Sequence, residues 1–509
     1  MSIDLLLRLE KLALFFVILF LPITGLPKRF SISFLGNNLS MYFLFIGMLL
    51  VVYEYTKQRT IVRKSFIKYF CIYALWQLIC LVIGLYSYEY NEYLTIEQSP
   101  KLLVILNFLS KHGLIINDLL ALKIWLLIRS IRDILFLNNQ VLALAFLVWH
   151  LYHGDWEKGF YDVRKAILSL VIVMGTYSFI ELLWLKMQIP FTEELLKTIN
   201  VFLYDPENSH GWWPPLLWRG QLRSLCPEPP FFSIISILCL PFVWSFFFSK
   251  RKNMFYYVLL VYYSMMIFAT NARTATVVVT LEFLFLVAMV LIIKNKEWIK
   301  SVVSILICMS IGFLINLINF NDLHNGREIN IAAELNDYTK NNIVSAVKKD
   351  VRSNNARLAN MIATFETIKD YPVFGVGYGL KDAYVDARLP EFSYSNDEVR
   401  NWSRYMHNEG VLKSGYPLLN QYLDVGVNNG VIGLILYLFP VFYFCKKLLV
   451  LYKINLLNYM HVVVFISFCG LLVAQLTNAY MLICNGVTWG LMLCMVENDN
   501  DLRATETTN

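Results

Sequence analysis

The chain has 509 residues, of which 57% are hydrophobic and only 16% are charged. This composition indicates a membrane protein with many crossings, because each crossing needs roughly 20 mainly apolar residues. Inside lipid every backbone polar group must be bonded within the protein, so we expect the crossings to be helices. The formal net charge of +7 does not require a nucleic-acid partner, because basic loops on the cytoplasmic side account for it.

The nine cysteines do not form the pattern of a disulfide-rich secreted protein. All but one lie in or beside apolar runs, and only Cys226 lies in an expected external loop. Their spacing is not that of a metal site, so we expect no disulfide framework, no metal and no cofactor.

The first third of the chain consists of apolar runs joined by short connectors. The run at 12–26 has no small-residue cleavage site after it, which favours an uncleaved first helix over a secretory signal. Basic residues at 57–68 and at 153–165 indicate two cytoplasmic loops. An odd number of crossings must then lie between residues 100 and 153. Three short helices satisfy this, as does one helix with re-entrant pieces, and the total becomes about 12–14 crossings.

Charge and hydropathy divide the chain into consecutive segments, with both termini expected in the cytoplasm. The segments are N-terminal transmembrane helices at 1–187, an external loop at 188–229, central transmembrane helices at 230–320, a large external loop at 321–427, C-terminal transmembrane helices at 428–496 and a cytoplasmic tail at 497–509. The expected fold is an all-α polytopic membrane protein with one large, partly helical external loop. Function is expected in that loop, because loops carry function while the helical scaffold positions them.

The large loop contains an expected amphipathic helix at 356–371, with Asn354 and Asn355 as its cap. Pro372 stops this helix, and the glycine-rich turn 375–379 follows. The apolar face that we expect the helix to bury consists of Leu358, Met361, Ile362, Phe365 and Ile368.

Two shorter segments place charged residues at the same external face. The first carries Arg223 and Glu228 just before the apolar run that starts at residue 230. It can be an interfacial loop in which Arg223 snorkels and Glu228 is solvated. The second carries Arg273 at the start of another apolar run, where an arginine can also be a simple interfacial anchor.

These segments resemble the bacterial O-antigen ligase and polymerase superfamily of membrane glycan-transferring enzymes. Arg223 with Glu228-Pro229 is similar to the family's Arg…Glu-Pro segment. Ala272-Arg273-Thr274 is similar to its Ser-Arg-Thr/Gly helix start.

Two further segments follow in the family's order. Residues 357–379, which end in Tyr-Pro-Val-Phe-Gly-Val-Gly-Tyr-Gly, resemble its Arg…Pro-Leu-x-Gly-x-Gly loop. Residues 420–434, with Asp424-Val-Gly426, resemble the segment that re-enters the membrane. The resemblance covers about residues 200–450, and the first 200 residues match only as a generic multi-helix half.

The resemblance implies an enzyme that joins a glycan on a polyprenyl diphosphate to an acceptor glycan, without a cofactor. It implies location in the bacterial cytoplasmic (inner) membrane, with the large loop periplasmic, and a role in lipopolysaccharide or other surface-polysaccharide biosynthesis. The implied partners are the lipid-linked glycan donor, the glycan acceptor and the bilayer, and a chain-length regulator is a further candidate. No nucleic acid is expected.

The family's residues carry over to specific positions. Arg223 and Arg273 are the candidates for stabilising the departing diphosphate, because a guanidinium stays charged and bonds phosphate oxygens through a planar fork. Glu228 or His407 is the candidate base for the acceptor hydroxyl. The candidate substrate-binding residues are Arg357, Gly375, Gly377 and Tyr378. We expect Arg223, Arg273 and the 375–379 turn to border one external cavity.

His407 departs from the ligase pattern. In ligases a His-Asn pair stands about three helical turns before a Glu-x-Gly, a place that Gly415 occupies here. His407-Asn408 lies eight residues earlier, so an insertion has shifted it or His407 is a solvated loop histidine.

The displaced histidine and the Arg…Glu-Pro form favour a polymerase, with an O-antigen ligase acting on lipid A core as the alternative. A polysaccharide or lipid exporter is a rival of another class, but transporters usually show internal repeats and midplane polar residues that we do not find here. A purely structural scaffold leaves the ordered motifs unexplained. The Gly-Val-Gly-Tyr-Gly run resembles a potassium-channel filter only in letters, because it follows a charged amphipathic helix and lacks a pore-helix pair.

Overall fold

The computed structural model is helical throughout its described part, as expected from the sequence. Its regular structure is α-helix with short 3-10 or π turns, and the only β-type pairing among the described residues is an isolated bridge between Ile32 and Gly36. The structure describes residues 3–32, 35–58, 64–96, 99–135, 139–204, 220–249, 253–318, 330–344, 352–410, 416–454, 456–477 and 482–506.

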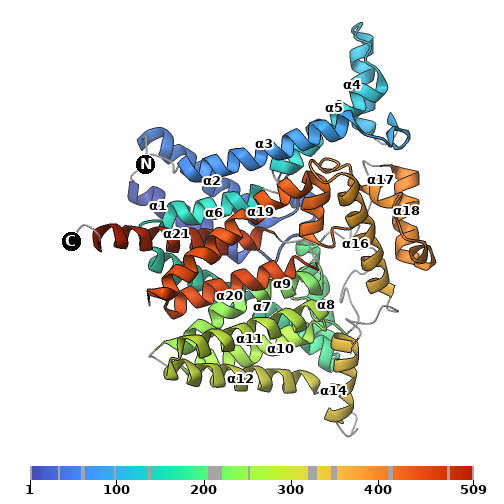
Figure 1. Cartoon of the computed structure of the whole chain (residues 1–509). Helices are drawn as coiled ribbons and strands as arrows, with labels where there is room; N and C mark the ends of the chain where they lie inside the picture. The colour runs from blue at the N-terminus through green and yellow to red at the C-terminus, as the bar shows by residue number, and fades with distance from the viewer. Residues whose placement is uncertain are drawn as a thin grey trace.

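Most helices lie side by side in one bundle, seen lengthwise in Figure 1. The bundle contains α1 (Ile3–Leu19), α2 (Leu39–Gln58), α3 (Lys64–Tyr86), α6 (Asn139–Tyr152), α7 (Trp156–Met187), α9 (Pro229–Trp244), α10 (Met254–Ala269), α11 (Arg273–Ile293), α12 (Lys296–Leu317), α19 (Gln421–Lys453), α20 (Tyr459–Ala474) and α21 (Ile483–Glu506). The helix α8 (Pro190–Leu203) packs beside α7.

The helices of the bundle have the length and composition of membrane spans. Seven of the described helices are long and apolar enough to cross a membrane, and four shorter ones are also apolar. The central helix α9 is buried almost along its whole length, whereas α2 and α3 expose large apolar side chains. This pattern suits a bundle surrounded by lipid, and it confirms the expected all-α polytopic fold.

The two ends of the bundle differ. Both chain termini lie at one end, on the left in Figure 1. The polar segment lies at the opposite end, where its helices cap the bundle. These helices are α14 (Ile331–Thr339), α16 (Arg352–Asp370), α17 (Lys381–Asp386) and α18 (Asp397–Glu409).

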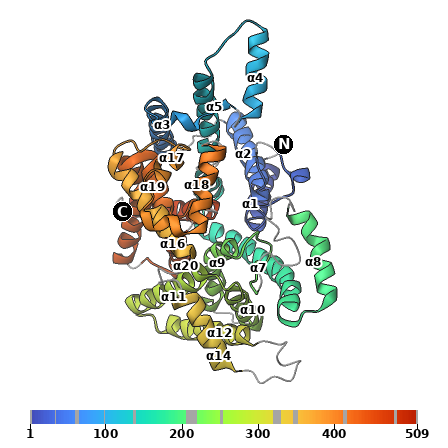
Figure 2. The same ribbon diagram turned by 90° about the vertical axis from the view of Figure 1, so that its right-hand side faces the viewer.

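The region 100–153 contains three short helices, of which only α6 lies within the bundle. The other two, α4 (Pro100–Lys111) and α5 (Asp118–Asp133), extend beyond it at the same end as α17 and α18 (Figures 1 and 2). The region has the three short helices of one expected arrangement, but α4 and α5 neither pack within the bundle nor re-enter it.

A second hydrophobic cluster explains why α5 leaves the bundle. It joins Leu85 at the end of α3, Leu122 and Leu126 of α5, and Tyr384 of α17. The cap of the bundle is therefore built from the 81–134 region together with the large polar segment. The sequence did not indicate this partnership, because a short crossing was one of the interpretations of this region.

The prediction of which face of α16 is buried is wrong. The helix begins before Asn354, so neither Asn354 nor Asn355 is its cap, and Phe365 is 50% exposed. The buried stripe instead consists of small and polar residues, namely Ala356, Ala359, Asn360, Ala363, Thr364 and Thr367. Small side chains let α16 approach α19 and α17 closely.

Candidate functional site

Arg273 opens α11 and lines the largest cavity among those described at the capped end. The cavity has a volume of about 540 Å³. It lies between the ends of the bundle helices and α14, and its lining is Leu185, Lys186, Gly220, Gln221, Ala269, Asn271, Arg273, Asn316, Leu317, Glu334, Asp337, Tyr338, Asn341 and Asn342. A helix N-terminus with an arginine on it offers backbone N–H groups, the positive end of the helix dipole and a guanidinium to an anion.

Both signs of charge line this cavity. Lys186, near the end of α7, also lines the cavity and donates to the backbone carbonyl of Asn316 at 2.7 Å. Glu334 and Asp337 face the same space from α14. The cavity can therefore hold an anion near Arg273 and Lys186 while a carboxylate accepts a proton nearby.

The first turns of α16 contact Arg273 and carry Arg357. Arg273 donates to the side-chain oxygen of Asn354 at 2.6 Å. Arg357, one turn further along α16, donates to the backbone carbonyl of Thr477 at 2.8 Å. The start of α16 thus joins the start of α11 to the turn after α20.

Arg223 lies inside the bundle rather than on the cavity wall. Its side chain is 2% exposed, its Nε lies 3.8 Å from Glu181, and its guanidinium stacks on the Tyr204 ring at 4.1 Å. Glu181 also accepts from the backbone N–H groups of Arg223 and Ser224 at 3.3 and 2.8 Å.

The Arg223 loop nevertheless adjoins the Arg273 connector. Leu222 donates its amide to Ala269, and the Asn271 side chain donates to Gly220. Gly220 and Gln221 reach the Arg273 cavity, while Arg223 turns inward. Glu228 is the N-cap residue of α9 and makes no side-chain capping bond.

The 375–379 turn is hydrogen-bonded to the membrane bundle and so attaches the polar segment to it. Gly375, Gly377 and Gly379 all have positive φ, which glycine adopts without strain. The amides of Val376 and Gly377 donate to the carbonyls of Val427 and Asn428 at 2.8 and 3.1 Å. These bonds attach the turn to α19 just before the non-helical Gly430 kinks that helix.

Tyr378 lines a second cavity, of about 200 Å³, on the side of α5. Its lining is rich in charge and consists of Leu126, Arg129, Ser130, Asp133, Tyr378, Gly379, Lys381, Asp382, Tyr416, Leu418, Asp424 and Asn428. Burial raises the pKa of Tyr378, and the nearby carboxylates of Asp424 and Asp133 raise it further. The phenol therefore stays protonated and can donate a hydrogen bond.

The family comparison agrees with these placements. Residues 258–438 match the sequence model of a family described as O-antigen ligase. This segment, about a third of the chain, is similar to that family. This match confirms the resemblance to the O-antigen ligase and polymerase superfamily, whose members are glycan-processing membrane enzymes. No curated protein sequence matches the chain.

The matched segment 258–438 contains most of the predicted site, including Arg273, Arg357, the 375–379 turn and His407, and Arg223 and Glu228 precede it. The predicted residues do not share one cavity. Arg273 and Tyr378 line different cavities, and Arg223 lines neither of these two.

Within the matched segment, His407 lies on α18 and lines neither of the two cavities. Its side chain is 51% exposed, and its Nε2 lies 3.3 Å from the Tyr93 hydroxyl. Its Nδ1 lies 2.8 Å from the backbone carbonyl of Ser403 and 3.7 Å from Asp386. Gly415, which occupies the ligase position of the histidine, lies outside the described residues.

Sequence reasoning missed an ion pair in the matched segment. Lys381 and Asp424 lie 3.8 Å apart and are 10% and 11% exposed. One carboxylate oxygen of Asp424 has no hydrogen-bond partner among the described residues. A signal was present, because Asp424 occupies the acidic position of the segment that resembles the family's Glu-x-Gly.

Proposed function

We propose that the protein is a surface-polysaccharide polymerase that acts on polyprenyl-diphosphate-linked oligosaccharides at the outer face of the cytoplasmic membrane. In this proposal the capped end of the bundle is external and the end with both termini is cytoplasmic. The observation that carries the proposal is the position of Arg273, at the start of an apolar helix and on the wall of a cavity of about 540 Å³.

That position suits a lipid diphosphate. The phosphates of a polyprenyl carrier lie at the membrane surface while its chain remains in lipid, and α11 begins at the end of the bundle where the cap starts. Arg273, Lys186 and the N–H groups of α11 would surround the diphosphate from two sides.

The reaction transfers the glycan from the diphosphate to an acceptor hydroxyl. The bond between the sugar and the diphosphate breaks, the new glycosidic bond forms, and the hydroxyl proton leaves. Negative charge grows on the departing diphosphate, so fixed cations stabilise the transition state more than the ground state.

The proton needs an acceptor, and the geometry adds two candidates. Glu334 and Asp337 line the Arg273 cavity from α14. Glu228 and His407 remain proposals based on the family resemblance. A base must come within about 3 Å of the hydroxyl, directly or through one water. We favour the two carboxylates of α14, because they line the same cavity as Arg273.

The Tyr378 cavity is proposed as a glycan subsite. Tyr378 offers a ring face and a protonated hydroxyl, and Lys381 and Asp382 offer charged partners for sugar hydroxyls. A cavity with several polar groups near an aromatic ring suits a sugar better than a lipid chain.

An O-antigen ligase is the second candidate, because the matching domain family carries that description. Deleting the gene and running surface polysaccharide on a gel separates the candidates. Single-repeat products would support the polymerase, and accumulated long chains on the lipid carrier would support the ligase. Loss of both with intermediates facing the cytoplasm would indicate an exporter and contradict both.

A further inference from the structure

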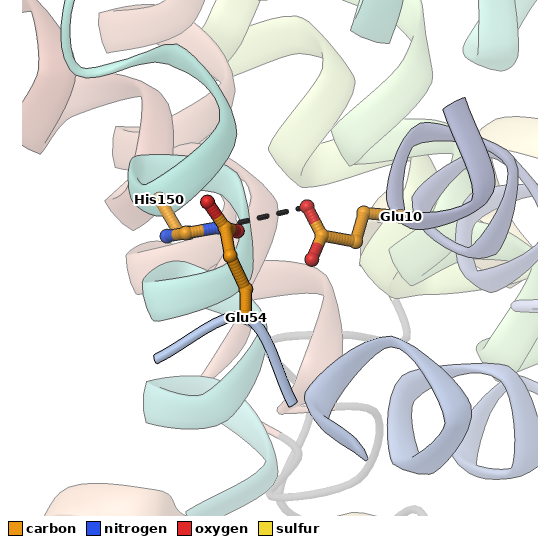
Figure 3. A group of neighbouring side chains, drawn as sticks. All are labelled: Glu10, Glu54 and His150. Atoms are coloured by element: carbon orange, nitrogen blue, oxygen red, sulfur yellow. Dashed lines mark hydrogen bonds and ion pairs between the residues drawn. The ribbon is translucent and has the colours of Figure 1, made fainter. Parts of the chain in front are cut away.

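A charged cluster lies at the opposite end of the bundle from the proposed glycan site. Glu10 of α1, Glu54 of α2 and His150 of α6 come together there, and one ligand atom of each lies within 4.8 Å of the others. Figure 3 shows the Glu10 carboxylate facing the imidazole of His150 beside Glu54. The His150 Nε2 atom is 2.9 Å from Glu54 and 3.5 Å from Glu10.

Glu10 is the member of the cluster whose carboxylate lacks hydrogen bonds within the described part of the chain. It is fully buried, with 0% of its side chain exposed. Neither of its carboxylate oxygens has a hydrogen-bond partner among the described residues. A buried carboxylate without such bonds is costly, and structures usually compensate it with a paired charge or a metal ion.

The charges of the three groups do not balance without a further positive charge. Two carboxylates and a protonated histidine leave a net charge of −1 in a mostly buried place. Two carboxylates, a neutral histidine and a divalent cation sum to zero. A cation would also supply the missing partner for Glu10.

We propose that Glu10, Glu54 and His150 bind a divalent cation of the zinc or manganese class. Zinc binds imidazole nitrogen and carboxylate oxygen at about 2.0–2.2 Å, so tetrahedral ligands lie roughly 3.4 Å apart. The separations of 2.9 and 3.5 Å are close to that value. A mixed imidazole and carboxylate set fits zinc or manganese better than calcium or magnesium.

The other ring nitrogen of His150 supports this assignment. Its Nδ1 atom lies 3.1 Å from the hydroxyl of Tyr55. In the cation-bound form Nδ1–H would donate to the Tyr55 oxygen, which leaves the Nε2 lone pair free for the metal. A bond to the second nitrogen is the usual way in which a metal-binding histidine is oriented.

The cation would fasten α1, α2 and α6 to one another. These three helices pack together at the end that carries the chain termini. The three residues are not part of the lining of the Arg273 cavity, so the inference is a structural clamp and does not depend on the proposed glycan transfer. It also adds a metal to a chain whose sequence suggested none.

The test uses the full-length protein, purified in detergent, stripped with a chelator and dialysed against Zn²⁺ or Mn²⁺ alone. We expect about one tightly held ion per chain and a higher melting temperature with the ion, because ligands that bind the folded state stabilise it. His150→Ala and Glu54→Gln should lose both effects. His153→Ala is the matched control, because His153 is exposed nearby and contacts backbone carbonyls of its own helix.

Two results would overturn the clamp. One is no saturable binding of either ion to the wild-type protein, which would leave a protonated His150 between the carboxylates. The other is equal binding by His150→Ala and the wild type, which would place the ion elsewhere. If Glu10→Gln fails to insert because Glu10 is buried, the partly exposed Glu54 still provides the test.

Discussion

The Nε atom of Arg223 lies 3.8 Å from a carboxylate oxygen of Glu181, and both side chains are almost completely buried. The pair ties the loop before α9 to the middle of the bundle, because Glu181 also accepts two backbone N–H groups of that loop. An arginine fixed in this way supports the fold, whereas the family resemblance assigns it to the diphosphate.

The two roles of Arg223 can be separated by removing one or both charges. Breaking a buried ion pair on one side leaves an uncompensated charge and costs about 3–5 kcal/mol. We therefore expect Arg223→Met and Glu181→Gln each to lower the melting temperature in detergent, and the double variant to recover much of the loss. A folded double variant that no longer transfers glycan would assign Arg223 to the reaction. Wild-type stability of Arg223→Met would contradict the structural role.

The orientation of the bundle can be tested with single cysteines and a membrane-impermeant maleimide. Tyr405 on α18 is 60% exposed, and the side chain of Lys300 near the start of α12 is 68% exposed. We expect Tyr405→Cys to be labelled in intact spheroplasts and Lys300→Cys only after permeabilisation. The wild-type chain is the background control, since it has nine cysteines of its own. The reverse labelling pattern would put the proposed site on the wrong side of the membrane.

The glycines of the turn and the kink should be intolerant of a side chain. Gly430 has a φ of 68°, and an added Cβ would lie 2.0 Å from the carbonyl oxygen of Val373. Gly430→Ala should therefore abolish stable insertion, because a backbone clash is added to about 1–3 kcal/mol of left-handed strain.

Two controls separate strain from clash. Gly113 also has a positive φ but has no atom within 4 Å of the added Cβ, so Gly113→Ala should lose stability through strain alone. Gly154 has neither problem, and Gly154→Ala should be nearly neutral. The measurements are the protein level in membranes and the melting temperature. Equal effects of all three substitutions would contradict the close backbone packing of Gly430 against Val373.

The sequence predicted the helices of the bundle better than the packing of the cap. Apolar runs of span length determine membrane helices, because lipid leaves the backbone no alternative. A short crossing was one interpretation of the segment at 118–133, yet α5 packs on α3 and contributes Leu122 and Leu126 to the hydrophobic cluster that contains Tyr384 of α17. Nothing in a single sequence tells whether an apolar face meets lipid or another part of the chain.

The predicted site residues divide into those that local sequence patterns place correctly and those that distant pairings place. Arg273 and Tyr378 line cavities, because each stands at a helix start or in a glycine turn that the sequence marks clearly. Arg223 is buried because Glu181 lies opposite it, 42 residues earlier in the chain. A pairing between distant positions of this kind leaves no pattern in one sequence. The sequence marks Asp424 through the segment that resembles the family's Glu-x-Gly, but it does not indicate the pairing of Asp424 with Lys381.

Arg273 provides the sharpest test of the proposed reaction. If it only anchors the start of α11, lysine should serve as well, because both side chains snorkel. If it grips a diphosphate through two parallel bonds, lysine keeps the charge and loses the fork. Loss of one charge-assisted bond costs roughly 1.5–3 kcal/mol, which corresponds to about a ten- to hundredfold lower rate when the bond forms mainly in the transition state.

We therefore expect Arg273→Lys to keep normal protein levels and to lower glycan transfer at least about tenfold, with Arg273→Ala lower still. Arg400→Lys is the matched control, because Arg400 makes an exposed ion pair with Asp397 on α18 and should be neutral. Asn354→Ala removes the partner that holds Arg273 at 2.6 Å, so it should lower transfer by a smaller factor. The measurement is glycan product per unit of inserted protein. Wild-type output from Arg273→Lys would make Arg273 an anchor and move the search for the phosphate ligand to Lys186, which lines the same cavity.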